Sequence, residues 1–177
     1  MLHIFEILKR RRSVRQFNHD SINKEILIKL VEAGIWAPTG GNAQTWFFII
    51  VTNLEKIEKI KATSPGISGT PRALIVICQD KEFAYKKGGE VGRDVLSVMD
   101  SAMAAQNILL QACEEKLGSC VVYSFYKKGL KILLNLPNNI VPELIITLGY
   151  PKVIPKAPIR KLNGIYFFEV FQNETRK

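Results

Sequence analysis

The stretch Phe47-Phe-Ile-Ile-Val51 is an unbroken run of apolar residues, and it decides how the rest of the chain is interpreted. Such a run favours a strand that is covered on both faces over a strand at the edge of a sheet. A second run of this kind, Ala73-Leu-Ile-Val-Ile-Cys78, predicts another buried strand. Two more strands are expected at 119–125 and 144–148. A last apolar stretch, 165–171, predicts a strand with no obvious place in its own core, so we expect it to pair with a partner subunit.

Helical patterns lie between the expected strands. Apolar residues within 2–8 predict a short first helix that ends near Arg10, and Ser21 is the expected N-cap of a second helix. The apolar stripe of the second helix is formed by Ile26, Leu27, Leu30 and Val31. Further helices are expected around 54–60, at 95–116 and at 129–134. In contrast, the polar stretch 79–92 contains the pair Gly88-Gly89 and predicts an exposed loop. Strands interspersed with helices predict a mixed sheet covered by helices.

The composition describes a chain that can fold without disulfides. With 177 residues, 47% of them apolar, and no internal repeat or linker, residues 1–177 are expected to form a single domain. Three cysteines in no metal-like or redox pairing fit a reducing compartment. No apolar stretch approaches the roughly 20 residues that span a bilayer, and charge follows the apolar part of the amino terminus, unlike a secretory signal. We therefore expect a cytoplasmic protein that does not associate with membranes.

Basic residues outnumber acidic ones by 25 to 16, and the formal net charge of +9 favours anionic partners. Several of them lie in Arg10-Arg-Arg-Ser-Val-Arg15. Guanidinium groups form paired hydrogen bonds with phosphate oxygens, and in an extended segment Arg11, Ser13 and Arg15 share one face. The alternative interpretation is a solvated basic helix end that the helix dipole stabilises. A nucleic-acid-binding surface is not expected, because no recognition motif accompanies the charge.

Three further stretches each suit a ligand site or an ordinary connection. The segment Ala37-Pro-Thr-Gly-Gly-Asn-Ala-Gln-Thr-Trp46 packs glycines, carboxamides and a tryptophan before a buried strand, although these are also ordinary turn and core residues. The segment Leu117-Gly-Ser-Cys-Val-Val-Tyr-Ser124 brings backbone close to a flat ligand or simply ends a helix. The segment Lys156-Ala-Pro-Ile-Arg-Lys161 closes over a phosphate or is a charged surface loop.

Taken together, these pieces resemble the nitroreductase family over essentially the whole chain. The resemblance rests on Arg-Arg-Ser-Val-Arg-Gln-Phe, Ala-Pro-Thr-Gly-Gly-Asn-Ala-Gln-Thr-Trp, the long helix of small residues, Leu-Gly-Ser-Cys and Leu-Gly-Tyr-Pro. It implies an α+β fold with a mixed, mainly antiparallel sheet flanked by helices, in an interleaved homodimer that binds FMN between its subunits. The tail 150–177 is then expected to reach the partner subunit.

The resemblance also implies which residues hold FMN. Arg11, Arg12 and Ser13 are expected at the phosphate and ribitol, and Arg15 at the pyrimidine edge near N1 and O2. The isoalloxazine ring is expected to meet residues of the other subunit, namely Pro38, Thr39, Gly40 and Asn42. The N5 and O4 region is expected to face the backbone of Tyr123 and Ser124, and the phosphate site is expected to be completed by Arg160 and Lys161.

Three departures from the family pattern concern this site. Thr45 stands where proline usually precedes the tryptophan, and Tyr123 stands where short members often have glycine. The segment Ile159-Arg-Lys-Leu162 replaces the usual Arg-Arg-Pro-Leu, which leaves the register of the basic contacts open by one residue. The chain has no room for the large helical insertion of longer members, and 79–92 is the remaining candidate for a lid.

The activity that the resemblance implies is ping-pong hydride transfer through flavin N5. NADH or NADPH is the electron donor, and the acceptor is a small aromatic, quinone or nitro compound. This chemistry needs no catalytic acid or base, and the chain contains neither a metal-binding cluster nor a nucleophile motif. The alternative is a carrier or regulatory flavoprotein that binds FMN without turnover by NADH or NADPH.

Overall fold

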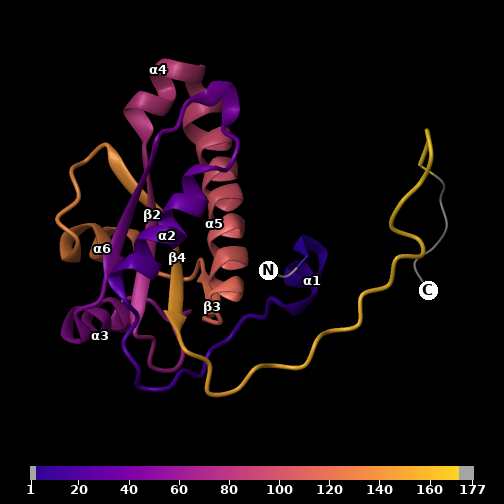
Figure 1. The fold of residues 1–177 in the computed structure, drawn as a ribbon. Helices are drawn as coiled ribbons and strands as arrows, with labels where there is room; N and C mark the ends of the chain where they lie inside the picture. Colours follow the sequence, from indigo (N-terminus) through magenta and orange to yellow (C-terminus); the bar gives the residue numbers. More distant parts are fainter. Residues whose placement is uncertain (1–2, 172–177) are drawn as a thin grey trace.

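The computed structural model describes residues 3–171 and centres on an antiparallel sheet (Figure 1). The strands run in the order β1-β2-β4-β3. Their bounds are Trp46–Val51 for β1, Ala73–Asp80 for β2, Gly118–Val122 for β3 and Ile140–Gly149 for β4. Outside these strands, an isolated bridge between Ser13 and Ser119 is parallel, which makes the pairing mixed. The predicted α+β class with a mainly antiparallel sheet is thus confirmed.

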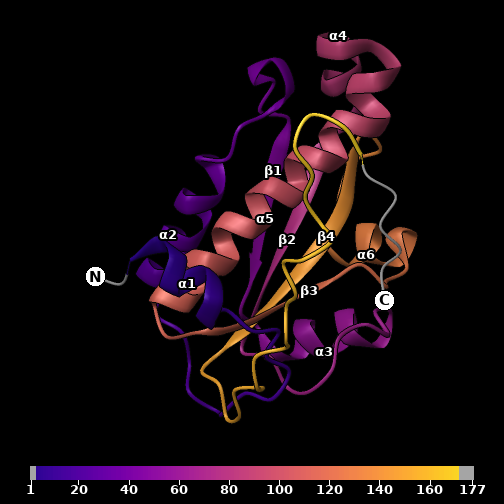
Figure 2. The ribbon, with the colours of Figure 1, turned by 90° about the vertical axis from the view of Figure 1, so that its right-hand side faces the viewer.

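Helices cover both faces of this sheet (Figures 1 and 2). On one face lie α2 (Lys24–Ile35) and α5 (Ser97–Glu114), and on the other lie α3 (Leu54–Ala62) and α6 (Lys127–Leu133). The alternation of side chains along β2 explains both layers, because Ile75 and Ile77 pack toward α2 and α5 while Leu74 and Val76 pack toward α3 and α6. The remaining helices are α1 (Ile4–Arg10) and α4 (Lys81–Val91). A π-helical turn, Gly92–Leu96, joins α4 to α5.

Two predictions about strands are wrong. The strand β1 lies at the edge of the sheet, and Phe47 is 53% exposed, so burial within this chain does not account for every apolar residue of the run. Residues 165–171 form no strand, and they belong to an exposed arm that leaves the body after Lys152, the last residue bonded to the segment 16–18 (Figure 1). The end of the predicted tail, 172–177, lies outside the described residues.

Two predictions about helices are also wrong. The stretch 79–92 is largely helix α4 instead of a loop, because the side chain of Asp80 accepts a hydrogen bond from the amide of Phe83 (2.9 Å) and caps the helix. Gly88 and Gly89 leave helical geometry only near its end. The N-cap of α2 is Asn23 instead of Ser21, since the Asn23 side chain accepts from the amide of Glu25 (3.1 Å). Within residues 3–171, no helix has the length and hydropathy needed to cross a membrane.

Candidate functional site

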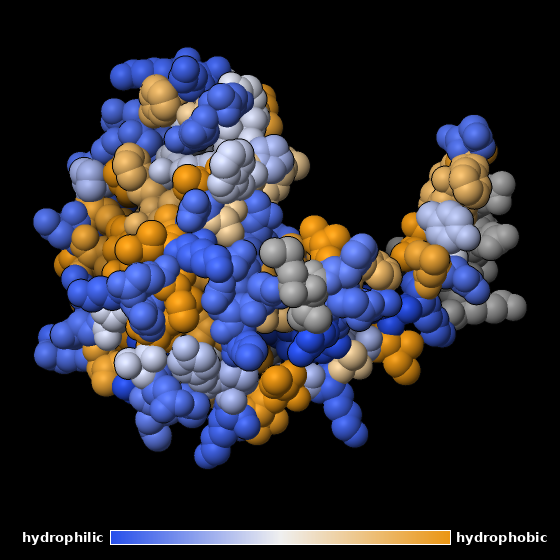
Figure 3. Space-filling view, viewed as in Figure 1, coloured by the Kyte–Doolittle hydropathy of each residue, from blue (hydrophilic) through white to orange (hydrophobic). Residues whose placement is uncertain are grey.

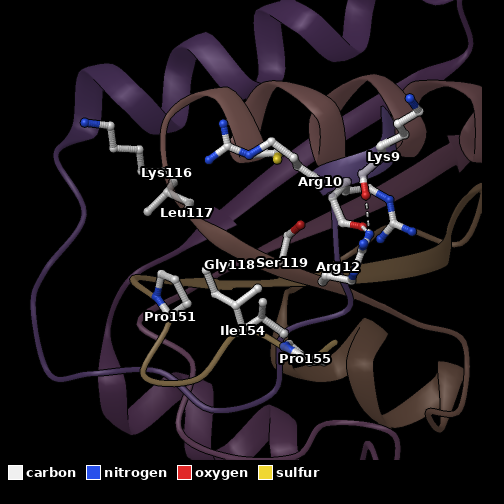
Figure 4. Close-up of a pocket in the computed structure, with 13 residues that line it drawn as sticks. Lys9, Arg10, Arg12, Lys116, Leu117, Gly118, Ser119, Pro151, Ile154 and Pro155 are labelled. Atoms are coloured by element: carbon white, nitrogen blue, oxygen red, sulfur yellow. Dashed lines mark hydrogen bonds between the residues drawn. The ribbon is translucent and has the colours of Figure 1, made fainter. Parts of the chain in front are cut away.

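A cavity of 480 Å³ with basic walls lies where α1, the end of α5, the start of β3 and the segment after β4 meet (Figure 4). Its cationic lining residues are Lys9, Arg10, Arg11, Arg12 and Lys116. Opposite them lie Gly118, Ser119, Pro151, Ile154 and Pro155. No acidic residue of the described chain belongs to the lining, so the walls of this cavity suit an anion.

The arginine segment is fixed in place by its pairing with β3. The chain leaves α1 at Arg10 and forms a parallel bridge from Ser13 to Ser119. The amide of Val14 donates to the carbonyl oxygen of Ser119 (2.9 Å). Val14 is buried against Gly118, where an added Cβ would lie 2.7 Å from Val14 Cγ1, so a larger residue would push the segment away. A glycine at the start of β3 therefore lets the arginines approach the sheet.

The arginines in the cavity lack acidic partners. Neither Arg10, Arg11 nor Arg12 forms a salt bridge with a carboxylate of the described chain. The Arg12 Nη1 atom instead donates to the carbonyl oxygens of Lys9 and Arg11, each at 2.6 Å (Figure 4). Burial raises the pKa of the Cys113 thiol, and the positive charge of the nearby arginines opposes that rise. The cavity therefore has a positive potential that its own chain does not neutralise.

The other residues predicted at the phosphate end are not all in this cavity. Ser13 contributes its backbone to the β3 bridge, and its side chain is not among the lining groups. Arg15 is exposed, and its Nη1 atom lies 3.5 Å from the carbonyl oxygen of Ser13. Arg160 and Lys161 are exposed on the arm and do not line the cavity. Within one chain, the structure therefore brings Arg11 and Arg12 together but leaves these other residues outside.

Tyr123 and Ser124 follow the last residue of β3. Tyr123 is 66% exposed, and Ser124 accepts a hydrogen bond at its carbonyl oxygen from the amide of Gly66 (3.1 Å). Both residues are apart from the basic cavity, which lies at the start of the same strand.

Three of the predicted ring-binding residues, Thr39, Gly40 and Asn42, lie in a turn that we call the Gly40 turn, residues 39–45, and Pro38 directly precedes it. Within it Gly40–Asn42 form a short 3-10 helix, and Gly41, Asn42 and Gln44 have positive φ angles of 59°, 53° and 48°. The amide of Gly40 donates to Oδ1 of Asp100 (3.1 Å) at the start of α5. Burial raises the pKa of the Asp100 carboxyl, and the Gly40 hydrogen bond opposes that rise.

Thr45, the residue that departs from the usual proline, closes the Gly40 turn. It is only 3% exposed, and its hydroxyl donates to Oε1 of Gln79 on β2 (2.5 Å). Pro38, Gly41 and Asn42 are exposed at the surface beside it. Of the predicted ring-binding residues, Pro38 and Asn42 are thus exposed and Thr39 and Gly40 are half-buried, while both ends of the turn are hydrogen-bonded to the body.

Arg11 and Arg12 in the basic cavity therefore lie at the opposite end of α5 from the Gly40 turn (Figure 1). Asp100 holds the Gly40 turn near the start of the helix, and Cys113 lines the basic cavity near its end. At 1.5 Å per residue, these two positions on α5 are about 20 Å apart. Sequence reasoning did not anticipate Asp100 or Lys116, because a single acidic or basic residue on a long amphipathic helix carries no local signal.

The sequence and the fold are both similar to those of known proteins. The Nitroreductase family model matches residues 8–64 and 64–150. A protein of Methanothermobacter thermautotrophicus, named as a candidate NADH dehydrogenase/NAD(P)H nitroreductase, is 31% identical over 159 residues, covering 86% of this chain and 79% of that protein. The crystal structure of a nitroreductase family protein from Clostridium difficile 630 is 27% identical with a TM-score of 0.83, covering 97% of this chain and 100% of that one. A candidate nitroreductase of Desulfovibrio desulfuricans, crystallised in complex with FMN, shares the fold at 23% identity with a TM-score of 0.80, covering 97% and 99% of the two chains.

Proposed function

Because the chain belongs to the Nitroreductase family, we propose that it is an FMN-dependent oxidoreductase that transfers a hydride from NADH or NADPH to a small acceptor. The observation that carries the proposal is the basic cavity at the end of α1, whose arginines have no acidic partner in the described chain. A phosphate ester would supply the missing negative charge and accept paired hydrogen bonds from guanidinium groups. The related Desulfovibrio protein was crystallised with FMN, which carries such a phosphate.

In this proposal the basic cavity takes the phosphate end of FMN, and the Gly40 turn lies against its ring. Arg11 and Arg12 would hold the phosphate, with Ser119 and the backbone of Gly118 beside it. The exposed Pro38, Gly41 and Asn42 would offer a surface to the flat ring. When bound, FMN supplies the hydride-accepting and hydride-donating chemistry, and the protein supplies position and electrostatics. This division fits a chain in which His3 and His19 are the only histidines.

The proposal includes a homodimer, because about 20 Å of helix separates the two groups of residues in one chain. The dimer would bring the Gly40 turn of one protomer to the basic cavity of the other. Apolar side chains of α5 that no other part of the described chain covers support this, among them Val98, Met99 and Met103, which are 42%, 51% and 39% exposed. The exposed arm carries apolar residues that extend away from the body (Figure 3), and Phe168 on it is 76% exposed. An arm of this kind would bury its side chains on a second copy.

Arg15 would meet the flavin at N1 and O2, where reduced flavin carries negative charge. Among residues 3–171, its guanidinium makes one long contact, with the carbonyl oxygen of Ser13, so it is available to a ligand. A positive charge there stabilises the reduced form. Arg15→Ala is therefore expected to lower the flavin reduction potential and slow reduction more than it weakens FMN binding, as measured by anaerobic redox titration. Equal potentials in variant and wild type would refute this role.

The first experiment is a visible absorption spectrum of the purified protein, followed by addition of NADH or NADPH without oxygen. A flavin spectrum that bleaches is expected. A flavin that stays oxidised with both donors would favour the alternative of a carrier or regulatory flavoprotein. A colourless protein that refuses added FMN would overturn the proposal.

A pair of variants tests the basic cavity itself. Arg12→Ala removes a cation of the cavity and is expected to weaken FMN binding by about thirtyfold, as for a charge-assisted hydrogen bond worth about 2 kcal/mol. Lys59→Ala removes a cation from the exposed surface of α3 and serves as the control. Equal dissociation constants for the two variants would show that the cavity does not hold the phosphate.

A further inference from the structure

A chain of buried polar side chains runs from the Gly40 turn into the body. The Thr45 hydroxyl donates to Oε1 of Gln79 (2.5 Å), and Nε2 of Gln79 donates to the Ser101 hydroxyl (2.8 Å). Ser101 in turn donates to the carbonyl oxygen of Ser97 one turn earlier in α5 (2.9 Å). Each of these side chains is at most 3% exposed. Polar groups in a core are costly unless they are bonded, and this chain connects the turn to β2 and α5.

Asp100 provides a second attachment at the other end of the turn. Its side chain is only 2% exposed, and its Oδ1 accepts from the amide of Gly40 (3.1 Å). The amide of Gln44 also donates to the Thr39 hydroxyl (3.3 Å), which closes the turn on itself. Between the two attachments, Asn42 and Gln44 adopt left-handed backbone angles that side chains disfavour. Such a conformation persists only where the surroundings hold it.

We propose that Thr45 and Asp100 are positioning residues, which fix the two ends of the Gly40 turn and thereby set the place of the flavin ring against the hydride donor. This inference rests on the proposed function, in which the turn lines the ring. The two residues do not touch the ring themselves, and they act through Gly40 and the backbone of the turn. The phosphate end of the site lies at the other end of α5, so it does not depend on them.

The rate of hydride transfer and the affinity for FMN should respond differently to a change in the Gly40 turn. Hydride transfer depends steeply on the distance and angle between donor and acceptor atoms, whereas the affinity for FMN depends largely on the charged phosphate contacts. Thr45→Val keeps the shape of the side chain and removes the hydroxyl. It is expected to slow flavin reduction at saturating NADH or NADPH by about tenfold while the FMN dissociation constant changes less than threefold.

The test compares Thr45→Val with Thr147→Val in the full-length protein. Thr147 is also buried, and its hydroxyl donates to the carbonyl oxygen of Cys120 (3.3 Å) in the sheet, far along the chain from the turn. Amide hydrogen exchange of residues 39–45 is measured together with the reduction rate. Thr45→Val is expected to speed exchange in the turn by about tenfold, the loss of one buried hydrogen bond, and Thr147→Val is not.

Two variants of Asp100 test the other end of the turn independently. Asp100→Asn keeps an oxygen that accepts from Gly40 and is expected to retain the wild-type reduction rate within threefold, while Asp100→Leu is expected to lose it as Thr45→Val does. Unchanged exchange in Thr45→Val, or an equal loss of rate in Thr147→Val, would overturn the inference but leave the proposed function intact. A wild-type protein that binds no FMN would instead overturn both.

Discussion

The buried carboxylate of Glu143 joins three elements of the fold, and its replacement tests how they are held. Its side chain is only 6% exposed on β4. One oxygen lies 2.5 Å from Nζ of Lys81 on α4, and the other lies 2.7 Å from Nζ of Lys127 on α6. Glu143→Gln keeps the shape of the side chain and removes the charge that both lysines face.

The expected cost follows from what each lysine retains. Removing one partner of a buried ion pair typically costs about 3–5 kcal/mol, because a charge is left buried and unpaired. Lys81 is 18% exposed but keeps two oxygen partners, the Ser97 hydroxyl (2.9 Å) and the carbonyl oxygen of Arg93 (3.0 Å). Lys127 is half exposed and returns to water, so its share is at most about 1 kcal/mol. We therefore expect Glu143→Gln to destabilise the protein by about 2–3 kcal/mol.

Urea unfolding at pH 7 and at one fixed protomer concentration measures this loss, since the stability of an oligomer depends on concentration. The matched control is Glu55→Gln, which breaks the exposed pair with Lys59 on α3. That variant is expected to lose little measurable stability, because both partners are exposed to water. If Glu143→Gln lost less than about 1 kcal/mol, or no more than the control, the two ion pairs of Glu143 would not stabilise the protein as the burial of this carboxylate implies.

Three further outcomes are expected. Cys113 lines the basic cavity while the other cysteines are buried, so N-ethylmaleimide should label Cys113 first. Bound FMN should slow this labelling in a time course followed by mass spectrometry. A labelling rate that FMN does not change would contradict the placement of the phosphate. Gly69→Ala should destabilise the protein by about 3 kcal/mol or more in urea unfolding, because the new Cβ would overlap the Arg15 carbonyl oxygen at a φ of +71°, whereas Gly41→Ala, at a φ of +59° with open space around it, should cost about 1 kcal/mol. Burial raises the pKa of Asp100 above its ordinary 3.8, so the native protein binds this proton more tightly than the unfolded chain does. Asp100→Asn should therefore be more stable than wild type at pH 7, and this gain should disappear as the pH falls toward 3.8. An advantage of Asp100→Asn that did not vary with pH would contradict that assignment.

The central part of the fold could be predicted because its residues report their own surroundings. The runs that contain Ile75 and Ile146 are apolar on successive positions, and both strands are covered on two faces by helices. The same signal was misleading for β1, because an apolar residue such as Phe47 is also expected where a second molecule covers an edge. Hydrophobic patterning reports burial, but it does not report which chain provides the cover.

Helix α4 was not predicted because the contacts that stabilise it leave little signal in the local sequence. The Asp80 cap is a single side chain, and the salt bridge from Lys81 reaches Glu143 in another element. A window of polar residues with two glycines has neither an apolar stripe nor a strong local propensity. Tertiary contacts therefore decide the conformation of this stretch.

The candidate site divides in the same way. Arg11, Arg12 and the Gly40 turn are local motifs, so the sequence could indicate them without knowledge of the fold. Asp100 and Lys116 enter the site only because α5 passes both places, and no spacing rule relates them to the motifs. The motifs at the two ends of the candidate site are visible in the sequence, while the helix that separates them was interpreted only as a long helix of small residues.

That separation gives α5 two roles that would otherwise belong to different elements. Its buried face, with Ala104 and Ile108, fixes the helix to the sheet, so the distance between the Gly40 turn and the basic cavity cannot adjust to a ligand. Under the proposed function, with a rigid spacing of about 20 Å, closure of the site over FMN would come from the approach of a second protomer. Any contact that FMN makes with both protomers must then stabilise their association by the same free energy by which association raises the affinity for FMN. Under the proposed function, cofactor binding and dimerisation are therefore one linked equilibrium, and the exposed apolar face of α5 is the part of the fold where that linkage is set.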